Sequence, residues 1–162
     1  MTTRILFCCM GNICRSPSAE GVVRALLAER APHLSVHLDS AGTHDYHVGE
    51  PPDRRAIAAA QRRGIDLSSL RARTVTAHDF ADFDVIVAMD ESNARELRAR
   101  ARTAPKTSAQ IRLMMDYVPD SRQREVPDPY YGGPEGFEEV LDLLEMAAAG
   151  LLAELQQQVT TR

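Results

Sequence analysis

The sequence ILFCCMGNICRSP, residues 5–17, carries the signals that decide the fold. Ile5 to Cys8 form an apolar run that ends near a Gly-Asn pair, which predicts a short strand buried on both faces. Ser16-Pro17 places a capping residue before a proline at the first helical position, and apolar residues then recur at helical spacing up to Pro32. A strand, a loop and a helix are therefore expected in direct succession.

The same alternation continues along the chain. Strand and helix patterns in turn predict a parallel sheet with right-handed crossovers and helices on both faces. We therefore expect the α/β class, with one domain over residues 1–162 and a sheet of four parallel strands. The loop at 117–134 contains four prolines and is long for a compact domain, as functional loops often are. Further strands are expected at 35–41, 85–89 and 111–115, and helices at 51–63, 90–101 and 137–155, with one helical turn opened by 76–79.

Composition places the chain among ordinary globular proteins. It has 162 residues, of which 44% are hydrophobic and 26% charged, and a formal net charge of -4. The negative charge argues against a nucleic-acid-binding protein, which needs basic surface to neutralise phosphates. No secretory leader or membrane-spanning stretch is evident, so we expect a cytoplasmic protein without a membrane partner. Three cysteines crowded into seven positions fit reactive thiols in a reducing compartment better than a disulfide scaffold.

The loop between the first strand and the first helix has the geometry to hold an anion. Cys9 and Arg15 are separated by five residues, and a loop of this length can turn its backbone N–H groups inward. The helix that begins near Ser16 adds the positive end of its dipole. Gly11 permits the close turn, and Asn12 tolerates a left-handed conformation. We expect a phosphate-binding loop made of Met10, Gly11, Asn12, Ile13, Cys14, Arg15 and Ser16.

The residue types in this loop predict nucleophilic chemistry at phosphorus. A cysteine at a helix N-terminus beside a cation is held largely as a thiolate, so we expect Cys9 to attack phosphorus. Arg15 offers a planar fork of donors for two phosphoryl oxygens, and Ser16 can donate a hydrogen bond to the sulfur. A cysteine-to-arginine spacing alone arises often by chance, but the Gly-Asn pair and the Ser-Pro helix start make it specific. Cys8 is expected to be simple packing, whereas Cys14 is either packing or a redox partner that captures oxidised Cys9.

Several motifs resemble those of one enzyme family, in the same order along the chain. Residues 9–17 resemble the signature loop of the low-molecular-weight protein-tyrosine phosphatases, and residues 128–131, Asp-Pro-Tyr-Tyr, resemble their acid loop. Residues 40–43 and 49–53 resemble the second strand of that family and the loop after it, and 89–93 the segment after its third strand. The resemblance covers nearly the whole chain and implies hydrolysis of phosphotyrosine through a phosphocysteine intermediate.

This resemblance also implies roles for single residues. Asp128 would protonate the leaving phenolate oxygen and then activate water, although an Asp-Pro pair alone indicates only a turn. Asn12, Ser16 and Ser40 would hold the loop in shape. Leu70 stands where relatives commonly carry a histidine, so we expect slightly altered loop stability rather than lost activity. The implied walls of the substrate pocket are Ile13, Tyr46, Tyr130 and Tyr131.

We expect neither a metal nor a cofactor. The five histidines lack zinc-like spacing with the cysteines and are expected at surface or loop positions. Phosphotyrosine proteins are the implied partners, and in bacterial relatives the partner is often an autophosphorylating tyrosine kinase. Solvated faces are expected for Arg71, Arg73, Arg95, Arg98, Arg100 and Arg102.

Three other functions remain open at this point. Thiol-dependent arsenate reductases of the same fold relay oxidation through two late cysteines, but no cysteine follows Cys14. Phosphoarginine phosphatases tend to carry a smaller polar residue at the position of Ile13, where isoleucine favours a flat aromatic substrate. A phosphoprotein-binding module without catalysis would have no reason to keep both Cys9 and Asp128.

Overall fold

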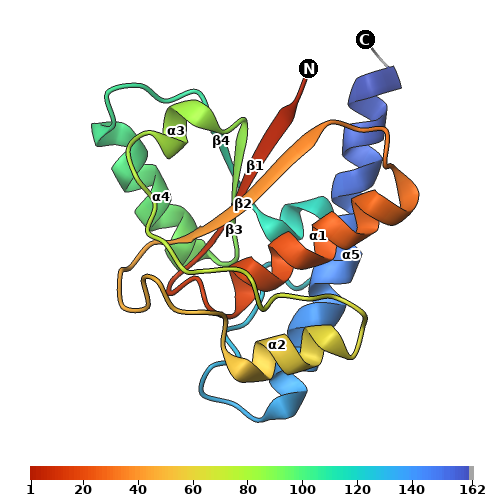
Figure 1. The fold of residues 1–162 in the computed structure, drawn as a ribbon. Helices are drawn as coiled ribbons and strands as arrows, with labels where there is room; N and C mark the ends of the chain where they lie inside the picture. Colours follow the sequence, from red (N-terminus) through yellow and green to blue (C-terminus); the bar gives the residue numbers. More distant parts are fainter. Residues whose placement is uncertain (161–162) are drawn as a thin grey trace.

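The computed structural model describes residues 1–160, and its strands and helices alternate along the chain (Figure 1). The strands are β1 (Thr3–Cys9), β2 (Val36–Gly42), β3 (Val85–Ala88) and β4 (Gln110–Leu113). The helices are α1 (Arg15–Arg30), α2 (Arg54–Gln61), α3 (Asp79–Asp82), α4 (Glu91–Thr103) and α5 (Pro134–Thr160), with a short 3-10 helix η1 (Met114–Tyr117) after β4. The domain expected from the sequence extends to residue 162, and its last two residues lie outside this description.

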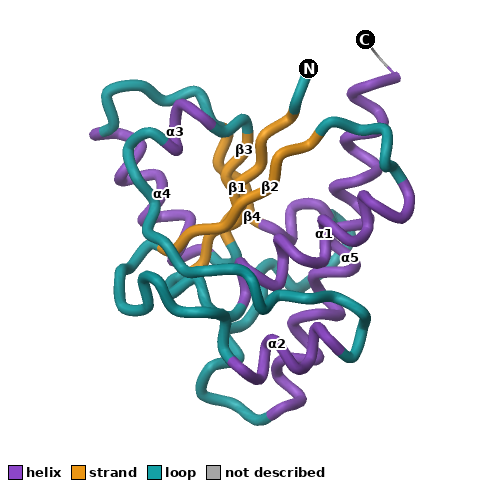
Figure 2. The backbone as a smooth tube through the Cα atoms, viewed as in Figure 1, coloured by secondary structure: helices purple, strands orange, loops and turns teal. Residues whose placement is uncertain are grey.

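The four strands form one parallel sheet in the order β2-β1-β3-β4, which confirms the predicted fold class. Figure 2 shows these strands together at the centre of the molecule, with helices around them. From β1 the chain crosses to β2 on one side and then to β3 on the other, so the strand order reverses at β1. In open parallel sheets, ligands bind at the carboxyl ends of the strands next to such a reversal. Cys9 at the end of β1 and Met89 directly after β3 lie at this position.

Helices cover both faces of the sheet, as the alternation predicts. Along β1, Ile5 and Phe7 face one hydrophobic core while Leu6 and Cys8 face the other, because successive side chains of a strand point to opposite sides. The first core is closed by α1 and α5, and the second by α3 and α4, which Figure 1 shows on opposite sides of the sheet. The side chains of Ile5, Leu6, Phe7 and Cys8 are all fully buried. Packing from both sides therefore fixes β1 and holds Cys9 at its carboxyl end.

The long helix α5 covers the first of these cores. Its apolar stripe from Phe137 to Leu155 is buried, as the spacing predicts, whereas Glu139 and Glu145 on its other side are exposed. No helix within residues 1–160 has the length and the apolar content that crossing a bilayer requires.

Several element ends differ from the sequence prediction, and two of the differences have a clear physical reason. The strand expected at 111–115 ends at Leu113, where the Asp116 carboxylate accepts a hydrogen bond from the Leu113 main-chain N–H at 2.9 Å and closes the turn into η1. The second helix starts only after Asp53, whose carboxylate accepts from the Arg55 N–H at 2.8 Å and caps α2. Both corrections come from hydrogen bonds between side chain and main chain, which hydrophobic spacing does not reveal.

Candidate active site

The loop that follows β1 curls around the Cys9 sulfur. The Asn12 main-chain N–H donates a hydrogen bond to Cys9 Sγ at 3.3 Å, and Ser16 Oγ lies 3.0 Å from the same sulfur. Asn12 has a positive φ of 58°, a left-handed conformation that asparagine tolerates better than most residues. α1 begins at Arg15, so the positive end of its dipole lies beside the loop. The chain therefore surrounds Cys9 with groups that stabilise negative charge.

The Arg15 guanidinium is buried beside this loop. Its Nη1 donates to Asp90 Oδ2 at 2.6 Å and to the Val126 carbonyl at 3.0 Å, and its Nη2 lies 3.7 Å from Asp128 Oδ2. Burial alone lowers the pKa of the Arg15 guanidinium, but the negative groups of Cys9 and Asp90 outweigh burial and raise it. A fixed cation therefore lies next to the thiol and within reach of a carboxylate from a distant loop.

Asp90 is a central member of this arrangement that sequence reasoning does not single out. Asp90 lies just after β3, and Arg15 lies after the neighbouring strand β1. Because β1 and β3 are parallel neighbours in the sheet, their carboxyl ends bring the side chains of Asp90 and Arg15 together. Its other oxygen, Oδ1, accepts from the Asn93 N–H at 2.7 Å and caps α4. One carboxylate thus fixes both the guanidinium and a helix. The signal for it is positional: an acidic residue at the end of the strand next to the nucleophile strand.

A buried polar network supports the loop. Asn12 Nδ2 donates to Ser16 Oγ at 2.8 Å and to Ser40 Oγ at 3.0 Å, so the three residues expected to support the loop do meet. Ser40 Oγ donates in turn to Glu20 Oε1 at 2.8 Å, a contact that the sequence does not reveal. The Arg73 main-chain N–H donates to Asn12 Oδ1 at 3.0 Å. The Asn12 amide group is therefore paired at both its oxygen and its nitrogen.

A cavity of about 190 Å³ opens over the Cys9 sulfur. Asp128 enters it from the loop before α5, and the Tyr130 N–H donates to Asp128 Oδ1 at 3.0 Å. The rings of Tyr46 and Tyr131 are largely exposed, so the cavity has aromatic walls and an open mouth. The lining residues are Cys9, Met10, Gly11, Ile13, Cys14, Arg15, Tyr46, His47, Asp128, Tyr130 and Tyr131.

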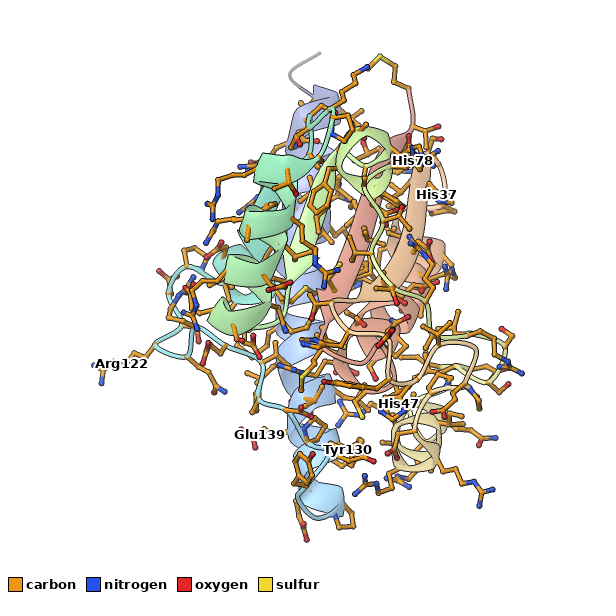
Figure 3. The ribbon with its side chains drawn as sticks, turned by 90° about the vertical axis from the view of Figure 1, so that its left-hand side faces the viewer. His37, His47, His78, Arg122, Tyr130 and Glu139 are labelled. Carbon is orange, nitrogen blue, oxygen red and sulfur yellow. The ribbon has the colours of Figure 1, made fainter. Side chains whose placement is uncertain are left out.

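His47 is a wall of this cavity that sequence reasoning places only at the surface or in a loop. The centroid of its ring lies 6.4 Å from that of Tyr130, and Figure 3 shows both at the end of the molecule opposite to His37 and His78. A Cβ atom on Gly11 would meet the His47 ring at 3.0 Å, so the glycine lets the ring approach the loop closely. The phosphate-binding loop is thereby covered on one side by an imidazole.

Comparison with known proteins relates this site to a family. The family profile described as low molecular weight phosphotyrosine protein phosphatase matches residues 4–161. The chain belongs to this family. The human low molecular weight phosphotyrosine protein phosphatase is 43% identical to it, over 86% of this chain and 87% of the human protein. The crystal structure of YfkJ from Bacillus subtilis is 40% identical, with a TM-score of 0.89 and coverage of 98% of this chain and 97% of YfkJ. That of DARP, a Drosophila arginine phosphatase, is 32% identical, with a TM-score of 0.88 and coverage of 93% and 96%.

The three cysteines of this phosphatase are free thiols in different environments. Cys8 is packed in the core under α3 and α4, as expected from the sequence. Its burial there raises the pKa of the thiol. Burial, reinforced by the nearby charge of Asp53, also raises the pKa of Cys14. Both thiols therefore stay protonated at neutral pH. Cys14 also lines the cavity, and its role as a redox partner of Cys9 stays a prediction.

Two arginines of the phosphatase are not on the solvated faces expected for them. Arg73 is half-buried, and its guanidinium pairs with Asp39 Oδ2 at 2.9 Å and with Asp79 Oδ2 at 3.0 Å. Arg100 donates from Nη2 to the carbonyl of Thr43, next to β2. Sequence spacing alone does not show these contacts, because the partners come from other elements. Both arginines hold loops near the site rather than meeting solvent freely.

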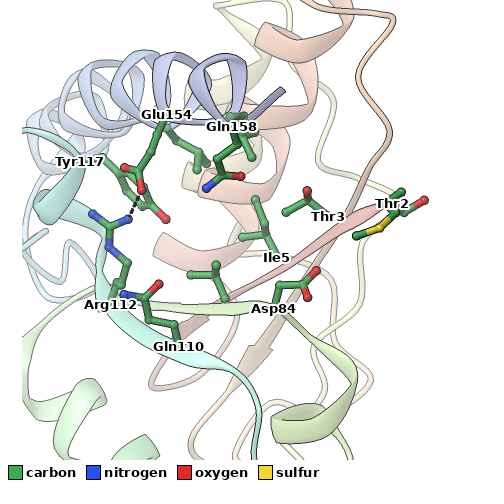
Figure 4. A pocket seen from close by; sticks show the side chains of 13 residues that line it. Thr2, Thr3, Ile5, Asp84, Gln110, Arg112, Tyr117, Glu154 and Gln158 are labelled. Atoms are coloured by element: carbon green, nitrogen blue, oxygen red, sulfur yellow. Dashed lines mark hydrogen bonds and ion pairs between the residues drawn. The ribbon is translucent and has the colours of Figure 1, made fainter. Parts of the chain in front are cut away.

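A larger cavity, of about 430 Å³, lies at the opposite end of the sheet of this phosphatase, between the amino ends of β1, β3 and β4 and helix α5 (Figure 4). There Arg112 Nη1 lies 2.6 Å from Glu154 Oε1, and the guanidinium stacks over the Tyr117 ring at 4.2 Å. These charges pair with one another, and the lining residues include no cysteine. Within residues 1–160, no group of three or more His, Cys, Asp or Glu side chains is arranged to hold a metal ion. The cavity over Cys9 is therefore the candidate site.

Proposed function

We propose that this chain hydrolyses phosphotyrosine in proteins, and small aryl phosphates, through a phosphocysteine intermediate. One observation carries the proposal: the Cys9 thiol, the Arg15 guanidinium and the Asp128 carboxylate line a single aromatic-walled cavity, although Asp128 is distant from the other two in sequence. Cavities of this kind, with few polar groups that converge, are the usual place for catalysis.

In the first step, Cys9 Sγ forms a bond to phosphorus while the bond from phosphorus to the phenolic oxygen breaks. The guanidinium of Arg15 holds two equatorial oxygens of the phosphoryl group, where negative charge is spread in the transition state. The leaving oxygen takes a proton from Asp128. The Tyr130 N–H donates to Oδ1 of Asp128, which leaves Oδ2 as the oxygen available to transfer the proton.

In the second step, water attacks the phosphocysteine and releases inorganic phosphate. The Asp128 carboxylate, now deprotonated, accepts a proton from this water, and Cys9 leaves as a thiolate. Ser16 Oγ, 3.0 Å from the sulfur, and the Asn12 N–H, 3.3 Å away, both stabilise the thiolate as it leaves. The enzyme thereby returns to its starting state with no cofactor in either step.

Assays on a phosphotyrosine peptide and on aryl phosphates of graded leaving ability test this mechanism. Cys9→Ser is expected to abolish turnover. Asp128→Ala is expected to lose about 10²-fold or more in kcat/KM on poor leaving groups, as is usual for a general acid, while it still binds inorganic phosphate. Asp120→Ala, at an exposed position of the same loop, is the matched control and keeps normal turnover. Activity retained by Cys9→Ser would sink the mechanism, and equal losses on all leaving groups would remove Asp128 from the role of acid.

Phosphoarginine is the second candidate substrate, because a structural relative at 32% identity is an arginine phosphatase. Ile13 and the tyrosine walls of the cavity favour a flat aromatic ring over a flexible guanidinium chain. We expect turnover of phosphotyrosine to exceed that of phosphoarginine, and Ile13→Thr to narrow the difference. Faster hydrolysis of phosphoarginine by the unmodified protein would reverse the choice. Arsenate reduction and binding without turnover are tested in the same samples, and we expect neither.

We also propose that Cys14 protects Cys9 from irreversible oxidation. Peroxide oxidises the Cys9 thiolate to a sulfenic acid, and attack by Cys14 forms a disulfide and releases water. Peroxide-treated protein is then expected to recover with a thiol reductant, and the Cys14→Ser variant to recover far less. Equal recovery of the two proteins would leave Cys14 as packing only.

The three free thiols support the cytoplasm as the compartment in which this enzyme works. We propose phosphotyrosine proteins as its partners, among them an autophosphorylating tyrosine kinase. Substrate trapping with Cys9→Ser in the source cell identifies the partner. Capture of the phosphorylated kinase but not of the unphosphorylated kinase would support this proposal. Equal capture of both forms would contradict it.

A further inference from the structure

We propose that Arg55, on the first turn of α2, is a positioning residue that holds the loop of Asp128 over the phosphate-binding loop. The inference rests on the proposed function, because it concerns the general acid of that mechanism. Arg55 does not touch the reacting atoms in this arrangement. It acts through the main chain of the residues next to Asp128.

Arg55 donates hydrogen bonds to two main-chain oxygens of the acid loop. Its Nη2 donates to the Tyr130 carbonyl at 2.9 Å, and its Nη1 donates to the Gly132 carbonyl at 3.4 Å. The guanidinium also lies over two rings, 5.6 Å from the centroid of Tyr130 and 4.7 Å from that of Phe137 at the start of α5. One side chain thus fixes the acid loop by hydrogen bonds and by stacking.

Only Tyr130 lies between Arg55 and the side chain of Asp128 in this chain of hydrogen bonds. Tyr130 accepts from Arg55 through its carbonyl, and through its N–H it donates to Asp128 Oδ1 at 3.0 Å. The residues from 127 to 132 have little other main-chain support: the backbone hydrogen bond recorded for them is a local one, from the Gly132 N–H to the Pro129 carbonyl at 3.1 Å. The link from Arg55 therefore ties this segment to α2, in addition to its continuation into α5.

The other end of the link reaches the phosphate-binding loop. The Asp53 carboxylate accepts hydrogen bonds from Arg55 Nε at 3.1 Å and from Nη2 at 3.0 Å. These two bonds hold the guanidinium in one orientation. The Asp53 N–H donates to the Ile13 carbonyl at 2.8 Å, inside the loop that surrounds Cys9. The pKa of Asp53 is lowered by these hydrogen bonds with Arg55, so the pair stays charged at neutral pH. A continuous path, from Ile13 through Asp53 and Arg55 to Tyr130, sets the acid relative to the nucleophile.

This path predicts a particular kinetic signature. If Arg55 positions the acid, its loss lowers kcat/KM, which reports the transfer of the phosphoryl group to Cys9, where the leaving group needs a proton, and changes it little where the leaving group does not. The second step is common to all substrates and does not enter kcat/KM. A misplacement of about 1 Å can cost up to 10²-fold in rate, and we expect about 10-fold for Arg55→Ala on phenyl phosphate because the acid stays near the site. On an activated nitrophenyl phosphate the change in kcat/KM is expected to stay within about 3-fold. Inhibition by inorganic phosphate should change little, because Cys9 and Arg15 are untouched.

The test compares five proteins, beside one control, by kcat/KM on both substrates: the unmodified chain, Arg55→Ala, Arg55→Lys, Asp128→Ala and the double variant of Arg55→Ala with Asp128→Ala. Arg54→Ala is the matched control, since Arg54 is the exposed neighbour on the same helix turn. Lysine keeps the ion pair with Asp53 but lacks the planar fork for two carbonyls, so it is expected to rescue kcat/KM only in part. The double variant is expected to be no slower than Asp128→Ala, because a positioning residue has nothing left to position.

The outcomes separate this inference from the proposed function. If Arg55→Ala is as fast as Arg54→Ala on phenyl phosphate, the inference alone is overturned. It is also overturned if Arg55→Ala slows both substrates equally and the double variant is slower than Asp128→Ala. Asp128→Ala without any leaving-group dependence overturns the acid assignment and the inference together. Urea unfolding of each variant checks that a loss of kcat/KM is not a loss of fold. A global defect lowers the folded fraction for both substrates and so counts against the inference.

Discussion

Asp90→Asn is the substitution that separates most clearly the tasks of one buried carboxylate. Asp90 Oδ2 accepts from Arg15 Nη1 at 2.6 Å, while Oδ1 accepts from the Asn93 N–H at 2.7 Å. Asparagine keeps an oxygen for the helix cap and removes the charge that faces Arg15. Asp90→Ala removes both. The difference between the two variants therefore reports the cap, and the asparagine variant reports the ion pair.

The expected magnitude follows from burial. The side chains of Arg15 and Asp90 are only 4% and 20% exposed. Removing one partner of a buried ion pair costs about 3–5 kcal/mol. Because Arg15 keeps the Val126 carbonyl and the neighbouring Cys9, we expect the lower end of this range, about 3 kcal/mol, for Asp90→Asn. Asp90→Ala should cost about 1 kcal/mol more for the lost cap. A displaced Arg15 should also lower kcat by about 10²-fold.

Urea unfolding and steady-state kinetics measure these effects on the same samples. A saturating inorganic anion is a further check, since phosphate supplies negative charge next to Arg15. At a phosphate concentration about 100 times its dissociation constant, any protein that binds it gains about 2.7 kcal/mol. The gain for Asp90→Asn at a given phosphate concentration is expected to be smaller than that of the unmodified chain, because a displaced Arg15 binds the anion less well. An asparagine variant with an unchanged free energy of unfolding and unchanged kcat would refute the claim that Asp90 orients Arg15.

Three further predictions concern the loop, the thiols and a buried phenol. Asn12→Gly keeps the left-handed conformation but loses three hydrogen bonds at about 1 kcal/mol each, and Asn12→Ala should cost about 1–2 kcal/mol more, as measured by urea unfolding. Iodoacetamide at pH 7 is expected to add once, at Cys9, because burial raises the pKa of Cys8 and Cys14; mass spectrometry that finds label on the Cys9→Ser variant contradicts this. Burial raises the pKa of Tyr117 to about 12, so the native state favours the neutral phenol. Its contribution to stability is complete below about pH 10, the usual pKa, and is lost between there and about 12; Tyr117→Phe should flatten the unfolding free energy over that window.

The fold was predictable from sequence where the deciding signals are local. The strand-loop-helix start at residues 5–17 needs only an apolar run, a Gly-Asn pair and a Ser-Pro start, and these signals do not depend on the rest of the chain. The end of the fourth strand was not predictable in this way. The apolar pattern continues through Met114 and Met115, and a hydrogen bond from the Leu113 N–H to the Asp116 side chain decides where the strand stops.

The candidate site divides in the same manner. Cys9 and Arg15 are close in sequence, and their spacing, together with the Gly-Asn pair and the Ser-Pro helix start, predicts that they meet. The partners of this pair come from far along the chain, since Asp90 is 75 residues from Arg15. Only the strand order places Asp90 beside Arg15, and the sequence gives no register from which to infer it. Family resemblance supplied Asp128, but resemblance of motifs does not show that Arg55 holds the loop that carries it.

The phosphate-binding loop of this chain is supported without a polar side chain at position 70, where the family resemblance implies a histidine. Leu70 is half-buried, and its recorded hydrogen bonds use the main chain. The polar side chains around Asn12 are nevertheless all paired: Glu20 accepts from Ser40 at 2.8 Å and from Arg24 at 2.6 Å. Among residues 1–160, the one buried side-chain nitrogen or oxygen without a partner is Oδ1 of Asn93, on α4 and outside this network. Since an unpaired buried group is the costly outcome and none arises here, an apolar residue at position 70 removes one support without breaking the others.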